Sequence, residues 1–212
     1  MSKLIKAIVF DMDGVLIDAR EWHYEALNSA LRLFGFEIGR EDHIELYDGL
    51  PTAKKLEMLT ARHGLPQELH SLINQLKQMF TMDIVQASCR PTFNHEYALS
   101  RLSREGFDLA VASNSIRSTI ETMMSKAALD SYLKFVLSNE DVSQPKPSPE
   151  IYVNAFKKLG FSANEVLVVE DNEHGIQAAR ASGANVMVVK SPDEVTYWSI
   201  SEKILEFDRS VE

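Results

Sequence analysis

Cysteine is almost absent from this sequence, since Cys89 is the only one in 212 residues. A single cysteine excludes an intramolecular disulfide, which fits a reducing compartment. Long apolar runs are missing too: no stretch approaches the ~20 apolar residues of a membrane-spanning helix. The start, MSKLIKAIVF, is too short in its apolar part for a signal peptide and lacks a small-residue cleavage site. We therefore expect a cytoplasmic protein that does not enter a membrane.

Basic residues are scarce as well. The chain has 22 Lys and Arg against 31 Asp and Glu, for a net charge of -9. This balance argues against nucleic-acid binding, which needs clustered cations. An acidic protein can still bind a small phosphorylated molecule if it gathers a few cations, or a metal ion, in one cleft. The 45% hydrophobic and 25% charged residues are an ordinary mix for a globular protein.

Short aliphatic runs are what the sequence does contain. Their central residues are mostly apolar rather than alternating, as in strands covered on both faces of a parallel sheet. Helical patterns separate the later runs, which predicts an α/β fold with a Rossmann-like parallel sheet of about five strands. The predicted strands are 5–10, 108–113, 134–138, 165–170 and 185–190.

Helix signals follow the strands. Apolar residues recur at helical spacing over 115–127, and a further helix is expected around 95–105. Ser148 and Pro149 are typical of an N-cap and first turn, and Gly160 ends that helix. A last helix is predicted from Gly175 to Ser182.

The long gap after the first strand contains helical patterns without a convincing strand. The expected helices, bounded by Gly and Pro, are 21–34, 41–48, 52–63 and 66–82. We interpret 18–87 as an inserted helical cap domain, and 1–17 with 88–212 as the α/β core.

Polar residues gather where the predicted strands end. Asp11 and Asp13 follow the first strand, Ser113-Asn114-Ser115 the second, and Glu170-Asp171 the fourth, while Lys146 precedes a helix. Ligands of α/β sheets bind outside the carboxyl ends of the strands, so these groups are expected at one edge.

Each group suits phosphoryl transfer. Asp11 can attack phosphorus, and Asp13, two positions on, faces the same side and can handle the proton of the leaving oxygen. Asp11 and Asp171 offer carboxylates to Mg²⁺. Ser113, with the N–H groups of 114 and 115 at a helix start, forms an anion cradle, and Lys146 adds a positive charge.

Each motif has another interpretation on its own. Asp-x-Asp also occurs in metal sites of sugar-nucleotide transferases and in surface turns, and Ser-Asn-Ser is an ordinary helix cap. A receiver domain shares the acids, hydroxyl and lysine but orders them differently. The four features in this order favour one phosphoryl-transfer site.

DMDGVL, SNS, KPSPEIY and VVEDNEHGIQAARASG resemble the four motifs of the haloacid dehalogenase-like hydrolases, in particular the phosphatase and β-phosphoglucomutase-like branch. The resemblance implies Asp11 as nucleophile, through an aspartyl-phosphate, and Asp13 as general acid/base. Ser113, Asn114 and Lys146 would hold the phosphoryl group. The implied Mg²⁺ ligands are Asp11, the Asp13 carbonyl and Asp171, with help from Glu170.

In this family the cap largely selects the substrate. His23 and Lys77 lie where relatives place cleft-facing residues. The mutase carries a phosphate-binding arginine where this chain has Thr52, which weakens a mutase function. A second departure is Asn172, where the family often has Ser or Thr.

We expect a Mg²⁺-dependent phosphatase acting on a small phosphorylated metabolite, such as a sugar phosphate. The alternatives are a phosphomutase of the β-phosphoglucomutase type and a non-catalytic phosphate-sensing module. We expect no nucleic-acid or membrane partner, and a monomer or weak homodimer.

Overall fold

The chain forms two compact units. The computed structural model describes residues 4–209. One unit, here the core unit, combines Met1–Asp18 with Cys89–Glu212, and the other, the helical unit, is Ala19–Ser88. The chain thus leaves the core unit after Asp18 and re-enters it at Cys89.

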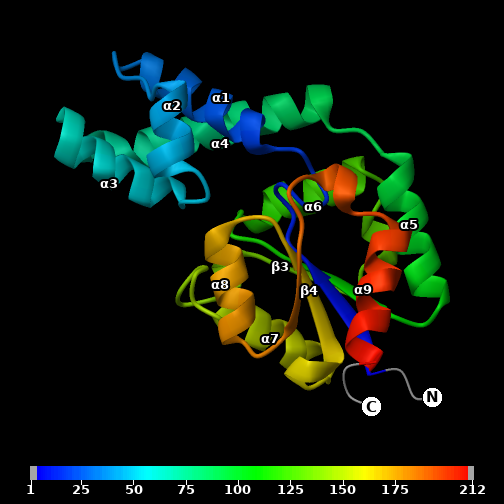
Figure 1. Cartoon of the computed structure of the whole chain (residues 1–212). Helices are drawn as coiled ribbons and strands as arrows, with labels where there is room; N and C mark the ends of the chain where they lie inside the picture. Colours follow the sequence, from blue (N-terminus) through cyan, green and yellow to red (C-terminus); the bar gives the residue numbers. More distant parts are fainter. Residues whose placement is uncertain (1–3, 210–212) are drawn as a thin grey trace. The chain divides into compact units, whose positions relative to one another are not determined.

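A five-stranded parallel sheet is the centre of the core unit, in the order β3-β2-β1-β4-β5 (Figure 1). Each predicted strand is present, trimmed by one or two residues at its ends. The α/β, Rossmann-like fold class is confirmed. The strands are β1 (Ala7–Phe10), β2 (Asp108–Ala112), β3 (Phe135–Leu137), β4 (Val166–Glu170) and β5 (Asn185–Val188).

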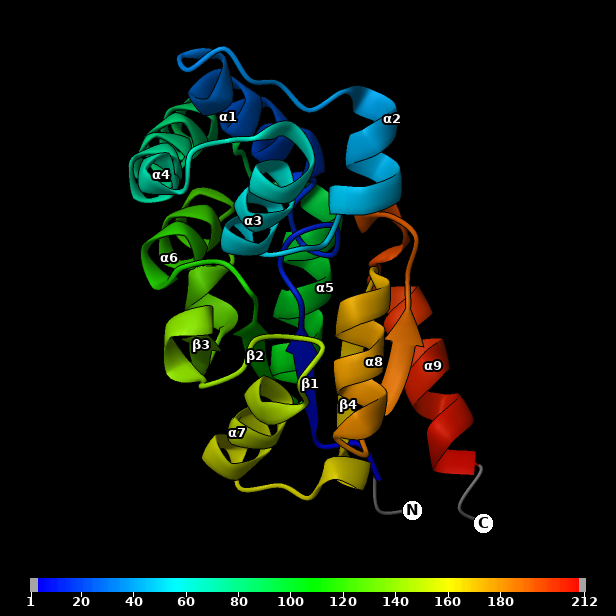
Figure 2. The same ribbon diagram turned by 90° about the vertical axis from the view of Figure 1, so that its left-hand side faces the viewer.

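Both faces of the sheet are covered. Ala7 and Val9 of β1 belong to an apolar cluster with α7 (Glu150–Leu159) and α8 (Glu173–Ala181). Because side chains alternate along a strand, the buried Ile8 and Phe10 face the opposite layer. Figure 2 shows α7 and α8 on the viewer's side of the sheet and α5 behind it. This packing explains the continuous apolar runs of the strands.

Three helix starts differ from the predicted ones. The helix expected from residue 115 is α6 (Arg117–Lys126), because Ile116 is still extended and serves as N-cap. The N-cap of α7 is Pro149 rather than Ser148, whose hydroxyl instead accepts from the Glu150 N–H at 3.4 Å. The α8 helix starts at Glu173, before Gly175, because the Asn172 side chain accepts the Gly175 N–H at 3.0 Å.

Two helices pack together on the opposite side of the core unit. The predicted helix at 95–105 is α5 (Phe93–Arg104), and it contacts α9 (Tyr197–Arg209). The sequence patterns did not indicate α9. The contact between α5 and α9 thus brings the end of the described chain back against the segment that follows the helical unit.

The helical unit has a core of its own. Its helices are α1 (Arg20–Arg32), α2 (Arg40–Asp42), a π-helical turn (His43–Tyr47), α3 (Thr52–His63), a 3₁₀ turn (Gln67–Leu69) and α4 (His70–Ser88). Leu27, Leu31, Tyr47, Leu59 and Ile73 are buried in one cluster. Each of the four predicted helices has a counterpart, although the second is mostly a π-helical turn. Within residues 4–209, no helix is long and apolar enough to span a bilayer.

Candidate functional site

Lys146 joins the carboxyl ends of three strands. Its Nζ donates to Asp11 Oδ1 at 2.6 Å, to Glu170 Oε1 at 2.7 Å and to the Ala112 carbonyl at 2.8 Å. Lys146, Asp11 and Glu170 are all buried. The parallel sheet therefore brings together residues separated by more than a hundred positions in the chain, at the carboxyl ends of β1, β2 and β4 and in the loop before α7.

Asn114 fixes the loop that carries Lys146. Its Oδ1 accepts the Lys146 backbone N–H at 3.0 Å, and its Nδ2 donates to the Lys146 carbonyl at 3.3 Å. The sequence assigned only the Asn114 amide to phosphate binding. The paired side-chain contacts give it a second task, which is to hold Lys146 in place.

Tyr152 is a buried site residue that the sequence reasoning missed. Its hydroxyl donates to Glu170 Oε1, the oxygen that also accepts from Lys146, and the Lys146 Nζ lies 4.8 Å from the centre of its ring. Tyr152 belongs to the KPSPEIY motif and follows Lys146 by six residues, which places it near the site but does not reveal its contact with Glu170.

Asp13 is held by the loop after β2. The Ser115 hydroxyl donates to Asp13 Oδ2 at 2.8 Å. The Ser115 N–H donates to the buried Ser113 hydroxyl at 3.1 Å. The sequence predicted that this N–H would donate a hydrogen bond to a bound anion. Because α6 begins only at Arg117, the cradle is a turn closed by Ser113 rather than the first turn of a helix.

Two glycines allow the acids to approach the backbone. A Cβ at Gly14, whose φ is +86°, would overlap the Asp171 carboxylate, and a Cβ at Gly175 would overlap the Glu170 carboxylate. Only residues without a side chain fit at these points. Gly14 thus lets the DMDG segment approach the EDNEHG segment, whereas Gly175 makes room for Glu170 within the EDNEHG segment itself.

Negative charge is concentrated around Asp11. Burial raises the pKa of Asp11 well above its usual value, and although Lys146 lowers it, the charges of Glu170, Asp13 and Asp171 raise it further. For Lys146, burial lowers the pKa, but Asp11 and Glu170 outweigh that effect and hold it above the ordinary value. One lysine thus faces several carboxylates, an arrangement that favours a further cation.

Three carboxylates are close enough to share a metal ion. Asp11, Glu170 and Asp171 each offer an oxygen within 4.8 Å of the others. An all-oxygen donor set fits a hard divalent cation such as Mg²⁺. Glu170 accepts from Tyr152, from Lys146 and, at 3.2 Å, from the Asp171 N–H. These contacts occupy the Glu170 oxygens and leave Asp11 and Asp171 as the candidates for direct contact with an ion.

The two predicted cap residues lie together in the helical unit. His23 of α1 and Lys77 of α4 approach within 3.2 Å, between His23 Nδ1 and Lys77 Nζ. Lys77 is buried, and Thr81 Oγ1 donates to its carbonyl at 2.8 Å. The sequence named them separately, and the packing of α1 against α4 makes them one pair.

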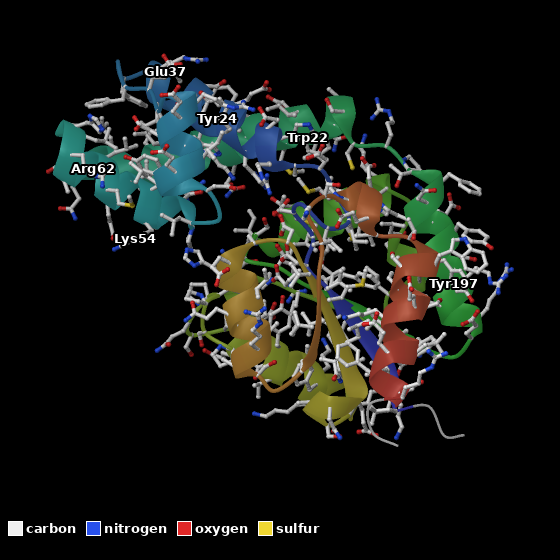
Figure 3. All side chains as sticks on the ribbon, in the orientation of Figure 1. Trp22, Tyr24, Glu37, Lys54, Arg62 and Tyr197 are labelled. Atoms are coloured by element: carbon white, nitrogen blue, oxygen red, sulfur yellow. The ribbon has the colours of Figure 1, made fainter. Side chains whose placement is uncertain are left out.

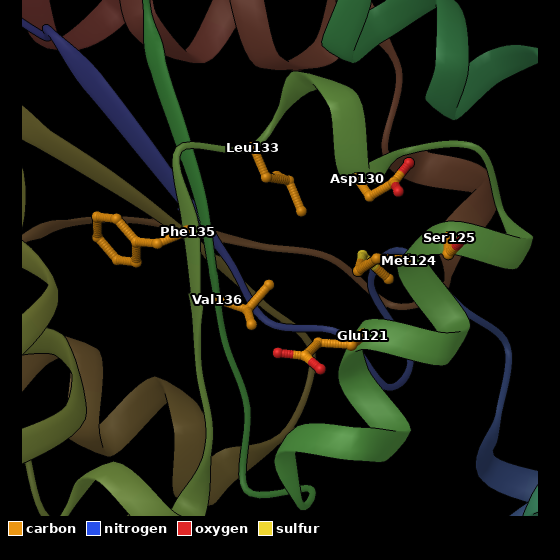
Figure 4. Close-up of a pocket in the computed structure, with 7 residues that line it drawn as sticks. All are labelled: Glu121, Met124, Ser125, Asp130, Leu133, Phe135 and Val136. Carbon is orange, nitrogen blue, oxygen red and sulfur yellow. The ribbon is translucent and has the colours of Figure 1, made fainter.

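A separate hollow of about 320 Å³ lies at the β3 edge of the core unit (Figure 4). Its lining combines apolar side chains with two acidic ones. Its lining consists of Glu121, Met124, Ser125, Asp130, Leu133, Phe135 and Val136. The predicted site residues do not line this hollow, so it is distinct from the acid–lysine cluster.

A comparison of the sequence with models of known protein families gives a match that includes the segments of the site. The model of the haloacid dehalogenase-like hydrolase family matches residues 8–189, which include the acid–lysine cluster. The chain belongs to this family. The resemblance seen in the four motifs is confirmed, and the protein is a haloacid dehalogenase-like hydrolase.

Curated relatives of this hydrolase carry phosphatase names. The fructose-1-phosphate phosphatase YqaB of Escherichia coli is 25% identical over 90% of this chain and 99% of its own length. The bifunctional riboflavin kinase/FMN phosphatase of Arabidopsis thaliana is 24% identical over 97% of this chain, which spans only 54% of that protein. Among solved structures, the β-phosphoglucomutase of Clostridium difficile aligns with a TM-score of 0.81, covering 96% of this chain and 98% of that one. At 20% identity, this last likeness supports the fold alone.

Proposed function

We propose that the protein is a Mg²⁺-dependent phosphatase of small phosphorylated metabolites, working through an aspartyl-phosphate on Asp11. The observation that carries the proposal is the buried cluster of Asp11, Lys146 and Glu170, with Asp171 beside it. It joins a nucleophile to a cation and to a donor set for a metal ion. The phosphatase names of the curated relatives point the same way.

In the first half-reaction, an Asp11 oxygen forms a bond to phosphorus while the bond from phosphorus to the leaving oxygen breaks. Asp13 gives a proton to that oxygen, so the alcohol departs neutral. In the second half-reaction, water attacks phosphorus, Asp13 takes its proton, and Asp11 is released with inorganic phosphate. The hydrogen bond from Ser115 at 2.8 Å supports the position of Asp13 in both halves.

Lys146 has two tasks in this scheme. Its ammonium group holds Asp11 Oδ1 at 2.6 Å, which leaves the second oxygen of the nucleophile to attack. The same charge offsets that of the phosphoryl oxygens as they approach a cluster rich in carboxylates. Ser113 and the Asn114 amide are assigned to the remaining phosphoryl oxygens.

The donor set supports Asp11 and Asp171 as ligands of Mg²⁺, with Glu170 acting on the site indirectly. The Asp13 carbonyl is the further ligand that the family resemblance implies. When bound, the ion neutralises charge and polarises the phosphoryl group. Burial and the acidic neighbours raise the pKa of Asp11 and so disfavour its ionised form. A second cation beside Lys146 would stabilise that form. The ionised nucleophile needs more positive charge than one lysine supplies.

We assign substrate selection to the helical unit as a cap, with the His23–Lys77 pair as its polar contact. A cationic lysine next to an imidazole suits an oxygen-rich molecule such as a sugar phosphate. A mutase requires a hold on the second phosphate of a bisphosphate. Thr52, where the mutase has an arginine, supplies no charge for that purpose, so hydrolysis is favoured.

The decisive experiment is the Asp11→Asn variant assayed with p-nitrophenyl phosphate and Mg²⁺. The amide cannot form the acyl phosphate, so phosphate release should fall by about 10³-fold or more. Asp193→Asn, which changes an exposed residue, is the matched control and should keep wild-type activity. Full activity of Asp11→Asn, with an unchanged circular dichroism spectrum in both variants, would overturn the proposal.

A second assay separates hydrolysis from the mutase reaction. A sugar monophosphate is supplied with and without a sugar bisphosphate as primer. We expect free phosphate and no dependence on the primer. Formation of an isomeric sugar phosphate only when the primer is present would favour the mutase.

A further inference from the structure

Glu170 is a fully buried carboxylate that shares Lys146 with Asp11. Its Oε1 accepts from the Lys146 Nζ at 2.7 Å, while the same Nζ donates to Asp11 Oδ1 at 2.6 Å. A buried carboxylate is costly unless its oxygens accept hydrogen bonds, so both acids draw on one ammonium group. The position of Lys146 between them therefore depends on the other donors that each acid has.

The ammonium group of Lys146 has no donor to spare. An ammonium carries three hydrogens, and the third contact of Nζ is with the Ala112 carbonyl at 2.8 Å. Lys146 thus cannot strengthen its contact with one acid without weakening another. Within residues 4–209, the Asp11 carboxylate accepts a hydrogen bond from Lys146 alone. A shift of Nζ toward Glu170 would therefore leave the proposed nucleophile without its hydrogen bond.

Tyr152 supplies the donor that satisfies Glu170. Its hydroxyl donates to Glu170 Oε1, and the Asp171 N–H donates to Oε2 at 3.2 Å. Tyr152 is itself fully buried, in the first turn of α7. Burial and the charge of Glu170 raise the pKa of Tyr152 well above its ordinary value, so the hydroxyl keeps the proton that it donates. Part of the Glu170 charge is thus compensated without a further demand on Lys146.

The ring of Tyr152 acts on the same lysine. The Lys146 Nζ lies 4.8 Å from the ring centre, a distance at which an aromatic ring attracts a cation. The ring belongs to an apolar cluster with Ile151, Ala155 and Phe156, and this packing fixes the direction of the hydroxyl. One side chain thus contacts both the cation and one of the two anions that compete for it.

We propose that Tyr152 is a positioning residue of the phosphatase reaction, whose hydroxyl occupies Glu170 so that Lys146 stays on Asp11. The inference rests on the proposed function, in which Lys146 holds one oxygen of the nucleophile while the other attacks. Tyr152 touches neither the substrate nor the phosphorus atom in that scheme. It acts through the balance between Glu170 and Lys146.

Tyr152→Phe tests the hydroxyl while the ring remains. With one donor lost, Glu170 should draw Lys146 away from Asp11. The lysine keeps its charge within the cluster, so KM for p-nitrophenyl phosphate with Mg²⁺ should change by less than about threefold. The kcat should fall by about tenfold or more, because the nucleophile is no longer aligned. A purely structural role would lower the thermal midpoint and leave the kcat of the folded enzyme unchanged.

Tyr197→Phe is the matched control. Figure 3 labels Tyr197 on α9, where its hydroxyl donates to the Glu105 carboxylate at 2.6 Å. This variant removes the same phenolic hydroxyl from a carboxylate outside the acid–lysine cluster, and it should keep the wild-type kcat. A wild-type kcat in Tyr152→Phe, or a loss that lies entirely in KM, would overturn the proposal.

Crystal structures of the wild type and Tyr152→Phe give a measurement that needs no activity. In the variant, the Lys146 Nζ should lie farther from Asp11 Oδ1 and remain against Glu170. An unmoved lysine would overturn the proposal even if kcat fell. A wild type that releases no phosphate would instead refute the proposed function, and the place of Lys146 in the two crystals would still decide whether Tyr152 positions it.

A second background covers a Tyr152→Phe variant that does not fold. Glu170→Gln removes the charge that competes for Lys146, so loss of the hydroxyl leaves no buried anion short of a donor. Adding Tyr152→Phe to Glu170→Gln should change kcat by less than about twofold. A loss of about tenfold or more in this background too would mean that the hydroxyl acts by another route, and the proposal would be wrong.

Discussion

Gly175 illustrates how one residue without a side chain shapes the site. The carboxylate of Glu170 occupies the place where a Cβ of Gly175 would lie, although Gly175 is inside α8 and has an ordinary helical conformation. A glycine in a helix interior costs about 1 kcal/mol relative to alanine. Here that cost is offset by the close approach of α8 to Glu170, which in turn holds Lys146.

Gly175→Ala should therefore destabilise the fold, against the usual preference of helices for alanine. The methyl group displaces Glu170 and disturbs its bonds to Lys146 and Tyr152, with a loss of about 2–4 kcal/mol in the free energy of unfolding. Urea unfolding measures it. Gly39→Ala is the control, because its nearest neighbouring atom is 3.8 Å away. A Gly175→Ala variant as stable as the wild type would contradict the steric argument.

His43 is a buried histidine that the catalytic scheme does not use. Neither of its ring nitrogens has a hydrogen-bond partner among the described residues, and its ring lies 4.7 Å from that of Tyr24. Burial, with Lys55 nearby, lowers the pKa of His43 from 6.5 to about 4. The folded state thus holds this imidazole neutral.

The pH dependence of stability follows from that shift. Between about pH 6.5 and 4 the unfolded chain binds a proton at His43 that the folded chain does not, so stability should fall as pH falls. The shift sets an upper limit of about 3 kcal/mol to this loss. His43→Gln should show a smaller decrease in urea midpoint between pH 7 and 5, whereas His63→Gln, at an exposed position, should behave like the wild type. Equal slopes for the wild type and His43→Gln would contradict the assignment.

At the scale of single residues, the sequence predicted which side chains lie at the same edge of the sheet better than it predicted their individual contacts. Asp11 and Lys146 were expected at one edge of the sheet, and they meet there. The paired bonds of Asn114 to the Lys146 backbone were not foreseeable, because they depend on the path of two loops in space. Nor was the burial of Tyr152 against Glu170, which periodicity alone cannot distinguish from apolar packing.

Among the elements, α8 depends on its N-terminal cap. Asn172 accepts the Gly175 N–H at 3.0 Å and also donates to Asp171 Oδ1 at 3.3 Å. The contact with Gly175 caps the first turn of α8. The contact with Asp171 links this cap to a proposed metal ligand. This explains why α8 begins before the glycine at which the sequence placed its start.

Asn172→Ala should lower the free energy of unfolding by about 1 kcal/mol, the usual cost of losing a cap. Asn172→Ser keeps an acceptor at the N-cap and should retain most of that stability. The exposed Asn94→Ala variant in α5 is the control and should lie within about 0.5 kcal/mol of the wild type. Thermal or urea unfolding gives the order of the variants, and equal loss in the Ala and Ser variants would count against capping.

There is a physical reason why the sequence patterns did not predict α9. Ile200 and Ile204 are its buried residues, a narrow apolar stripe, while Trp198 and Leu205 are exposed on another side. Apolar residues on two sides of a helix blur the periodicity by which a helix is recognised.

At the scale of the whole molecule, the fold assembles the site from distant parts of the chain. The parallel sheet was predictable from its apolar runs, and the meeting of strand ends followed from its topology. The order β3-β2-β1-β4-β5, which sets β1 beside β4, was not predicted. That neighbourhood brings Asp11 and Asp171 together, so the proposed metal site exists only in the assembled sheet.

Mg²⁺ should therefore stabilise the entire core unit. An ion present at a hundred times its dissociation constant adds about 2.7 kcal/mol to the free energy of unfolding. Thermal unfolding with and without MgCl₂ measures the gain, EDTA should reverse it, and Asp193→Asn should show the wild-type gain.

Asp171→Asn should reverse the order of stability between the two conditions. Without metal the variant should be at least as stable as the wild type, because the Asp171 charge adds to the negative charge around Asp11 and helps to raise its pKa. With Mg²⁺ the wild type should become the more stable protein, since the variant has lost a carboxylate ligand. An equal gain from Mg²⁺ in both proteins would mean that the ion binds elsewhere, and the proposed ligand set would then be wrong.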